Sequence, residues 1–187
     1  MLYVSKGMVL RPSSEQLLYV THCGADYALT GIGARLWLNG RFEVCEANSI
    51  QDKRHLNKLQ ELGLVELSDE TGFIAVYYLL ARCVICPAKL KAVCSLLTPS
   101  ESYAWKWISK SGLRLSIGEL VKLFEDRVPP SPELLGKENA QALVQRLYAK
   151  DLIFDTTLDI QMETALRRDE VLKSILGLLR KKRLILI

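Results

Sequence analysis

The stretch Leu29-Thr30-Gly-Ile-Gly-Ala-Arg-Leu-Trp37 has a partial echo later in the chain, where Leu97-Thr98 is followed by Trp105 at the same spacing. A second echo aligns Leu59-Gln-Glu-Leu-Gly-Leu-Val65 with Leu147-Tyr-Ala-Lys-Asp-Leu-Ile153, and each copy has the pattern of a helix that runs into a strand. Recurring patterns of this kind indicate one supersecondary unit used more than once. The sequence therefore predicts two related helical units, with the two tryptophans as equivalent core residues.

The first unit is predicted to begin with a β-hairpin. Two short apolar runs at residues 8–11 and 17–21 flank Pro12-Ser-Ser-Glu15, a composition typical of a turn between strands. A further strand is expected at residues 27–29. Thr30 follows it and is placed to cap a helix over residues 31–38.

A second helix is expected from a cap at Asn48 or Ser49 to about Leu62, and Gly63 is placed to end it. Residues 64–67 and 73–78 are predicted to form two antiparallel strands after that helix. Two helices followed by a hairpin are typical of a winged helix.

The second unit has clear helix-start signals. Thr98-Pro99 predicts a helix to about residue 109, and Ser116 is expected to cap another over residues 117–127. A third helix is expected at about 137–150, with a short wing at 152–158. Residues 77–86 and 90–95 are expected to pair as a hairpin before the first of these helices.

The tail from residue 162 to residue 182 has the pattern of an amphipathic helix, with an apolar stripe made of Leu172, Ile175, Leu176 and Leu179. Such a stripe must pack on the body of the protein or on a second subunit, so a homodimer through this helix is one expectation. The predicted fold class is α+β, with two winged-helix-like units in tandem and a C-terminal amphipathic helix. The expected divisions are residues 1–78, 79–160 and 161–187.

The overall composition is that of an ordinary globular protein, with 187 residues of which 49% are hydrophobic and 25% charged. The formal net charge of +4 permits an anionic partner without requiring one. The first residues lack the pattern of a secretory signal. The most apolar run, residues 73–81, is much shorter than the roughly 20 residues of a membrane-spanning helix. We therefore expect no membrane segment and a cytoplasmic location.

The five cysteines are an odd number without an export signal, which argues against a disulfide framework. We expect most of them to be reduced and buried. Cys83-Val-Ile-Cys86 has a spacing used for zinc or redox chemistry, but residues three apart in a strand point to opposite faces. These two are predicted to be core cysteines, and His22 and His55 to be exposed. No metal, no cofactor and no enzymatic activity are expected.

The first half of the chain resembles the PqqD-like family of small winged-helix domains that grip leader peptides. The resemblance rests on the hairpin, the stretch from Leu29 to Trp37 and the helix that ends in Leu59-Gln-Glu-Leu-Gly-Leu-Val65. It implies that a leader peptide adds a strand to the edge of the hairpin sheet, beside the helix at residues 51–62. The residues implied to take part in the sheet are Leu17, Tyr19, Thr21 and Tyr27.

The leading functional hypothesis is a transcriptional regulator that binds double-stranded DNA. A helix beside a wing fits the major groove and needs basic and amide side chains on its outer face. The expected DNA-binding residues lie on one helix of each unit: Lys53, Arg54, Asn57 and Lys58 on the first, and Lys137, Gln141, Gln145 and Arg146 on the second.

Two alternatives stay open at this point. The first is recognition of a leader peptide as an added strand. The second is a structural scaffold that interacts with a partner protein. Salt-dependent binding to DNA would favour the regulator, and peptide binding that ignores the basic side chains would favour the peptide alternative.

Overall fold

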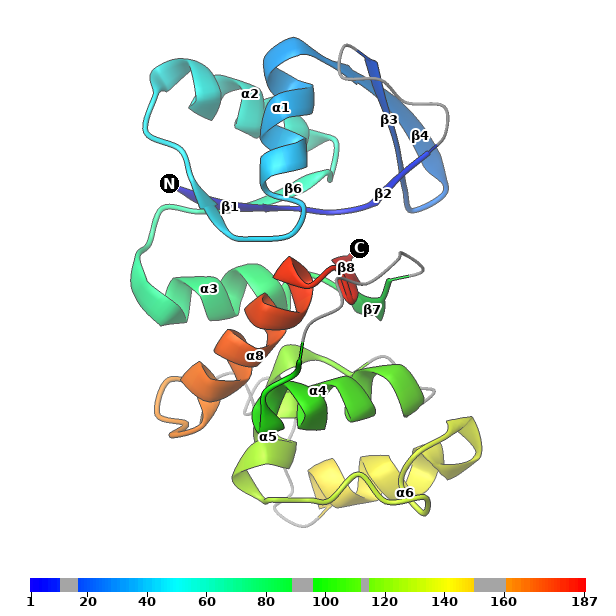
Figure 1. Ribbon diagram of the computed structural model, residues 1–187. Helices are drawn as coiled ribbons and strands as arrows, with labels where there is room; N and C mark the ends of the chain where they lie inside the picture. The colour runs from blue at the N-terminus through cyan, green and yellow to red at the C-terminus, as the bar shows by residue number, and fades with distance from the viewer. Residues whose placement is uncertain (11–16, 89–95, 112–114, 150–160) are drawn as a thin grey trace.

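The computed structural model describes residues 1–10, 17–88, 96–111, 115–149 and 161–187. It is a mixed α and β structure, as predicted, with small antiparallel sheets and helices. Figure 1 shows the N-terminal sheets with helices α1 and α2 at one end, and α4, α5 and α6 at the other. Helix α8 and the C-terminal strand lie between them. The tandem winged-helix interpretation is a finer prediction that this architecture leaves untested.

The predicted hairpin is confirmed and forms a sheet with strand order β2-β3-β4. Its strands are β2 (Met8–Val9), β3 (Leu17–His22) and β4 (Ala25–Thr30). Strands β3 and β4 are joined by Cys23-Gly24, and both residues have positive φ, 50° and 83°. Two positive φ values define a type I′ turn, whose twist matches that of the paired strands. The turn therefore sets the register of this pair.

The second sheet has the order β5-β1-β6, with β1 (Leu2–Ser5) between β5 (Cys45–Glu46) and β6 (Val65–Ser68). Helices α1 (Gly31–Asn39) and α2 (Ile50–Glu61) form where they were predicted, and they pack beside the two sheets. Ser49 caps α2 by accepting a hydrogen bond from the Asp52 N–H, whereas the Thr30 side chain makes no capping bond to α1. Trp37 and Leu56 are fully buried in the core that these elements enclose.

The predicted strand at residues 73–78 is wrong, because these residues lie in helix α3 (Gly72–Ala81). A short, uniformly apolar run has no periodicity that separates a strand from a buried helix. Here α3 packs against β1, β6, α5 and α8, which bury Ala75, Leu79 and Leu80. As a result, β6 is followed by a helix instead of the expected second strand of a wing.

Helices α4 (Pro99–Lys110) and α5 (Ile117–Glu125) begin at the predicted caps, and Thr98 and Ser116 each form a complete capping box. The expected third helix is broken into three short turns. A 3₁₀ turn, η1 (Lys137–Asn139), leads into α6 (Ala140–Val144), which continues as a π-helical turn, η2 (Gln145–Ala149). The predicted wing at 152–158 lies outside the described residues.

The tail helix is confirmed as α8 (Arg168–Arg180), and its apolar stripe packs on the body of the protein against α3, α4 and α5. Beyond α8, strand β8 (Leu184–Leu186) pairs with β7 (Ile85–Pro87). The expected hairpin of 77–86 with 90–95 is therefore wrong in its first strand, and its second lies outside the described residues. The Gly7 N–H donates to the Leu186 carbonyl at 2.8 Å, which joins the C-terminus to the N-terminal unit.

The two tryptophans of the echo do not occupy equivalent places. Trp37 is a core residue as predicted, but Trp105 is only half-buried, with the Arg183 guanidinium 5.5 Å from its ring centroid. Trp107, two residues further along α4, is the fully buried tryptophan of the second half. One turn of a helix holds 3.6 residues, so a shift of two positions moves a side chain to a different face.

Candidate functional site

Strand β4 is an edge of its sheet, because β3 pairs with it on one side and no described residue pairs on the other. In a hairpin with a two-residue turn, the residues that flank the turn, His22 and Ala25, exchange backbone hydrogen bonds, and the pattern then alternates along the pair. Tyr27 therefore bonds toward β3, whereas Asp26 and Ala28 direct their N–H and C=O groups away from it.

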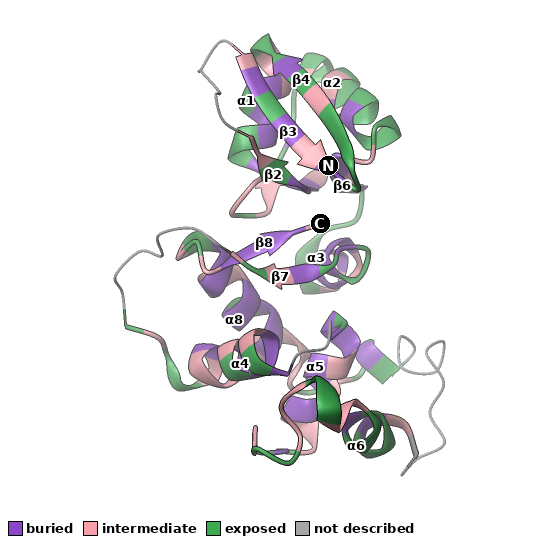
Figure 2. Cartoon of the chain, turned by 90° about the vertical axis from the view of Figure 1, so that its right-hand side faces the viewer, coloured by how far each residue is buried: buried purple, intermediate pink, exposed green. Residues whose placement is uncertain are grey.

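The other side of β3 confirms this pattern. Tyr19 pairs in register with Ala28, so its backbone should point away from β4. Its carbonyl does accept a hydrogen bond from the Leu10 N–H on the β2 side, at 2.9 Å. Asp26 and Ala28 are exposed, and Figure 2 shows β4 exposed along much of its length. The edge is therefore open to solvent.

The four sheet residues implied by the PqqD-like resemblance do not share one face. Side chains alternate along a strand, so Leu17, Tyr19 and Thr21 lie on the face opposite to buried Leu18 and Val20. Tyr19 is 37% exposed on that outer face. Tyr27 pairs with Val20 and lies half-buried on the inner face. The structure therefore places the first three over the outside of the sheet and Tyr27 at its inner border.

At the β3–β4 turn, His22 is buried, and the prediction that it is exposed is wrong. Its Nε2 atom lies 3.3 Å from the exposed Cys23 Sγ, and Nδ1 has no hydrogen-bond partner among the described residues. Burial lowers the pKa of His22 below its ordinary value, and the positive charge of Lys6 adds to this effect. These two effects therefore favour the neutral form of the imidazole. His55 is half-exposed on α2.

The outer face of α2 carries all four basic and amide residues that were predicted to bind DNA: Lys53, Arg54, Asn57 and Lys58 are exposed. Arg54, Asn57 and Lys58 line a surface depression together with Gln51, His55 and Glu61. Arg35 of α1 forms an ion pair with Asp52 at 2.7 Å, which fixes the two helices to each other on this side. The face is positive overall but contains two carboxylates.

The second predicted set, Lys137, Gln141, Gln145 and Arg146, is also exposed. However, these residues lie on η1, α6 and η2, at the end of the molecule opposite to α2 (Figures 1 and 2). The structure therefore does not bring the two sets together on one surface.

The cysteine predictions are confirmed only in part. Cys83 is buried and donates to the Leu79 carbonyl at 3.3 Å, and burial raises the pKa of its thiol to about 12. Cys86 and Cys45 are half-buried, and Cys23 is exposed, so the expectation that most cysteines are buried is wrong for the described ones. Among the described residues no three potential metal ligands cluster, and no helix is long and apolar enough to cross a membrane.

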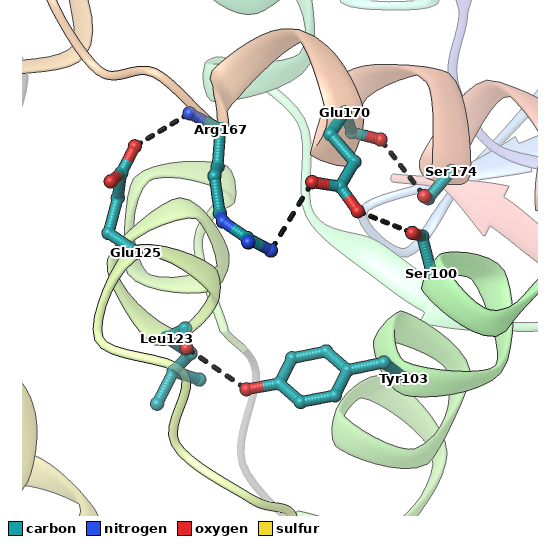
Figure 3. A network of polar contacts seen from close by, with 7 residues as sticks. All are labelled: Ser100, Tyr103, Leu123, Glu125, Arg167, Glu170 and Ser174. Atoms are coloured by element: carbon teal, nitrogen blue, oxygen red, sulfur yellow. Dashed lines mark hydrogen bonds and ion pairs between the residues drawn. The ribbon is translucent and has the colours of Figure 1, made fainter.

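A feature that the sequence analysis missed is a pocket of about 220 Å³ between α4, α5 and α8. Figure 3 shows the polar contacts around it, with the Glu170 carboxylate between Ser100 and Arg167 and the Tyr103 ring on the other side. The lining residues come from three regions of the chain: Pro99, Ser100 and Tyr103; Phe124 and Arg127; Arg167 and Glu170. No local motif joins these segments, so no sequence signal could have revealed the pocket.

Comparison with known proteins found no family model, no curated protein and no solved structure that matches this chain.

Proposed function

We propose that this protein recognises an extended peptide, which binds as an additional strand along β4. The observation that carries the proposal is the open edge, where the backbone groups of Asp26 and Ala28 point outward with no partner among the described residues. An unpaired strand edge is a template for an incoming strand, and backbone hydrogen bonds supply affinity in this binding mode. The resemblance of this half of the chain to PqqD-like domains supports a leader peptide as the class of ligand.

The side chains beside the edge indicate how a peptide would be selected. On the outer face, Tyr19 and Ala28 form a cross-strand pair in which a small residue at the edge leaves the tyrosine ring accessible. On the inner face, half-buried Tyr27 borders the core. Alternate residues of an added strand would contact these two surfaces, so an apolar side chain is favoured at both positions.

The test is selection of random linear peptides displayed on phage against the wild-type protein, followed by affinity measurements on Ala28→Pro. Proline removes an N–H that points away from β3, so the hydrogen bonds between β3 and β4 are kept. The incoming peptide strand, however, loses one hydrogen-bond donor and clashes with the proline ring. We expect selected peptides to bind Ala28→Pro at least about tenfold more weakly than wild type.

The matched control is Ala28→Ser, which keeps the N–H and should bind as wild type does. Amide hydrogen exchange adds a second measurement: peptide binding should slow exchange at Asp26 and Ala28, whose N–H groups have no partner in the part of the chain that the structure describes. Equal affinity of the proline and serine variants, or failure to select any peptide, would contradict the proposal.

DNA binding through α2 is a second candidate, favoured by the four exposed basic and amide side chains on one helix face. Basic side chains would hold phosphates while Asn57 reads a base edge. The expected result is that Arg54→Ala with Lys58→Ala lowers the salt slope of binding to random duplex DNA by roughly 2.

The control for DNA binding is the double variant Lys137→Ala with Arg146→Ala, which removes the same charge at the opposite end of the molecule. If α2 is the interface, the slope should change only in the α2 variant. An unchanged slope in that variant, or no DNA binding at low salt, would remove α2 as a DNA-binding surface.

A further inference from the structure

The pocket between α4, α5 and α8 has an apolar floor. The rings of Tyr103 and Phe124 meet edge to face, with centroids 4.5 Å apart, and Pro99 lies beside them in the lining. The Tyr103 hydroxyl donates toward the Leu123 and Val128 carbonyls, at 3.0 Å for Leu123, which holds the ring in place. This floor suits a flat apolar group.

The rim of the pocket is polar, with two arginines and one glutamate among its lining residues. The Glu170 carboxylate accepts hydrogen bonds from Ser100 Oγ at 2.5 Å and from Arg167 Nη1 at 3.4 Å, so both of its oxygens are engaged. Arg127, an exposed residue, also lines the pocket, and its guanidinium has no ion-pair partner among the described residues. The lining residues thus include two arginines and one glutamate, an excess of one positive charge, and the Glu125 carboxylate lies beside them on the Arg167 N–H.

The elements that hold this rim are fixed by their own hydrogen bonds. The Arg167 backbone N–H donates to Glu125 Oε1 at 2.6 Å, which ties the start of α8 to the end of α5. Arg127 has φ of 49°, a conformation that is uncommon for a residue with a side chain. This conformation ends α5: the Arg127 N–H donates to the Phe124 carbonyl at 3.2 Å and the Val128 N–H to the Leu123 carbonyl at 3.1 Å, a common helix C-terminal motif that fixes the backbone of Arg127.

We propose that this pocket binds a small organic carboxylate with an apolar, ring-sized body. Its carboxylate pairs with Arg127 and Arg167 at the rim, and its body lies against Tyr103 and Phe124. The volume of about 220 Å³ equals that of roughly seven water molecules at about 30 Å³ each, which suits a ring-sized group. The site is separate from the β4 edge, and its test does not depend on peptide binding.

The experiment is titration of the full chain with benzoate, followed by NMR of the backbone amides of Ser100, Arg127 and Arg167. Benzyl alcohol and benzylammonium are titrated in parallel, because they keep the ring and replace the negative charge with no charge or a positive one. Benzoate should shift these amides and bind at least about tenfold more tightly than benzyl alcohol. Benzylammonium should bind more weakly still.

The deciding variant is Arg127→Gly, which removes the guanidinium at a position where positive φ favours glycine, so the fold is not at risk. Benzoate affinity should fall at least about tenfold. Lys182→Gly is the matched control, because Lys182 is exposed, has φ of 54° and follows the far end of α8. It should bind benzoate as wild type does.

Three results would overturn the proposal. One is the absence of benzoate-induced shifts at these amides up to the solubility limit. Another is equal affinity for benzoate and benzyl alcohol, which would show an apolar crevice without charge selection. The last is unchanged benzoate affinity in Arg127→Gly.

Discussion

Replacing Trp107 with alanine should lower the free energy of unfolding by about 3–5 kcal/mol, the range seen when a buried aromatic side chain leaves a cavity. Trp107 is 0% exposed, and its ring lies edge to face with Tyr103 at a centroid distance of 6.5 Å. Neighbouring helices cannot collapse fully into the space that the indole leaves. Urea unfolding followed by circular dichroism would measure the loss without relying on tryptophan fluorescence.

Trp105 provides a control on the same helix. It is half-buried and contacts Arg183, so Trp105→Ala should cost only about 1 kcal/mol. The loss of unfolding free energy in Trp107→Leu should lie between the losses in these two variants, because leucine fills part of the space that the indole leaves. If Trp105→Ala were as costly as Trp107→Ala, the assignment of Trp107 as the core residue of α4 would be wrong.

The second large effect is expected at the Glu101–Lys181 ion pair. Lys181→Met should lower the free energy of unfolding by about 3 kcal/mol, because the Glu101 carboxylate stays buried without its positively charged partner. The Glu101 side chain is only 8% exposed, and the Lys181 ammonium lies 2.5 Å from it. Glu101 also accepts the Thr98 N–H at 2.7 Å in the capping box of α4. One carboxylate thus joins the start of α4 to the residue after α8.

The pH dependence of stability follows from the same contacts. Burial alone would raise the pKa of Glu101, but hydrogen bonds from Lys181 and Thr98 outweigh it and lower the pKa below the ordinary 4.5. The unfolded chain therefore binds this proton more readily. The stabilisation is fully present above pH 4.5 and is lost as pH falls further. Glu101→Gln should be less stable than wild type at neutral pH, with a smaller difference at about pH 3.

A surface ion pair is the matched control for this prediction. Arg180 Nε lies 3.9 Å from Glu43 Oε2, and the two side chains are 65% and 53% exposed. Arg180→Met should cost less than about 0.5 kcal/mol, because solvent screens such pairs. Equal effects of Arg180→Met and Lys181→Met in urea unfolding would show that the Glu101 pair is not buried in solution.

The candidate peptide site could be predicted from the sequence only in outline. The hairpin of β2 with β3 is visible in the two apolar runs, and the expected PqqD-like mode of binding predicted a role for the edge of its sheet. The edge itself is formed by β4, and the sequence pattern did not specify that this strand pairs with the side of β3 opposite to β2. The outward direction of the Asp26 and Ala28 backbone then follows from the register that Cys23-Gly24 imposes.

Local signals were sufficient where a helix start depends on a few neighbouring residues. Ser49, Thr98 and Ser116 cap helices as predicted, because a side-chain oxygen and an N–H two or three residues later form the bond without help from the rest of the fold. The amphipathic stripe of the tail helix was visible for a similar reason, since its period lies within one segment.

Only the tertiary structure decided the features that depend on distant contacts. Residues 73–78 form a helix because β1, β6, α5 and α8 surround them, and the apolar run alone is compatible with either structure. Strand β7 pairs with β8 at the other end of the chain, and Arg127 and Arg167 line the same pocket between three helices. The sequence by itself determined the short-range elements of this protein, because their hydrogen bonds close within a few residues. Their partners, and with them both proposed binding sites, were decided by packing between segments far apart in the chain.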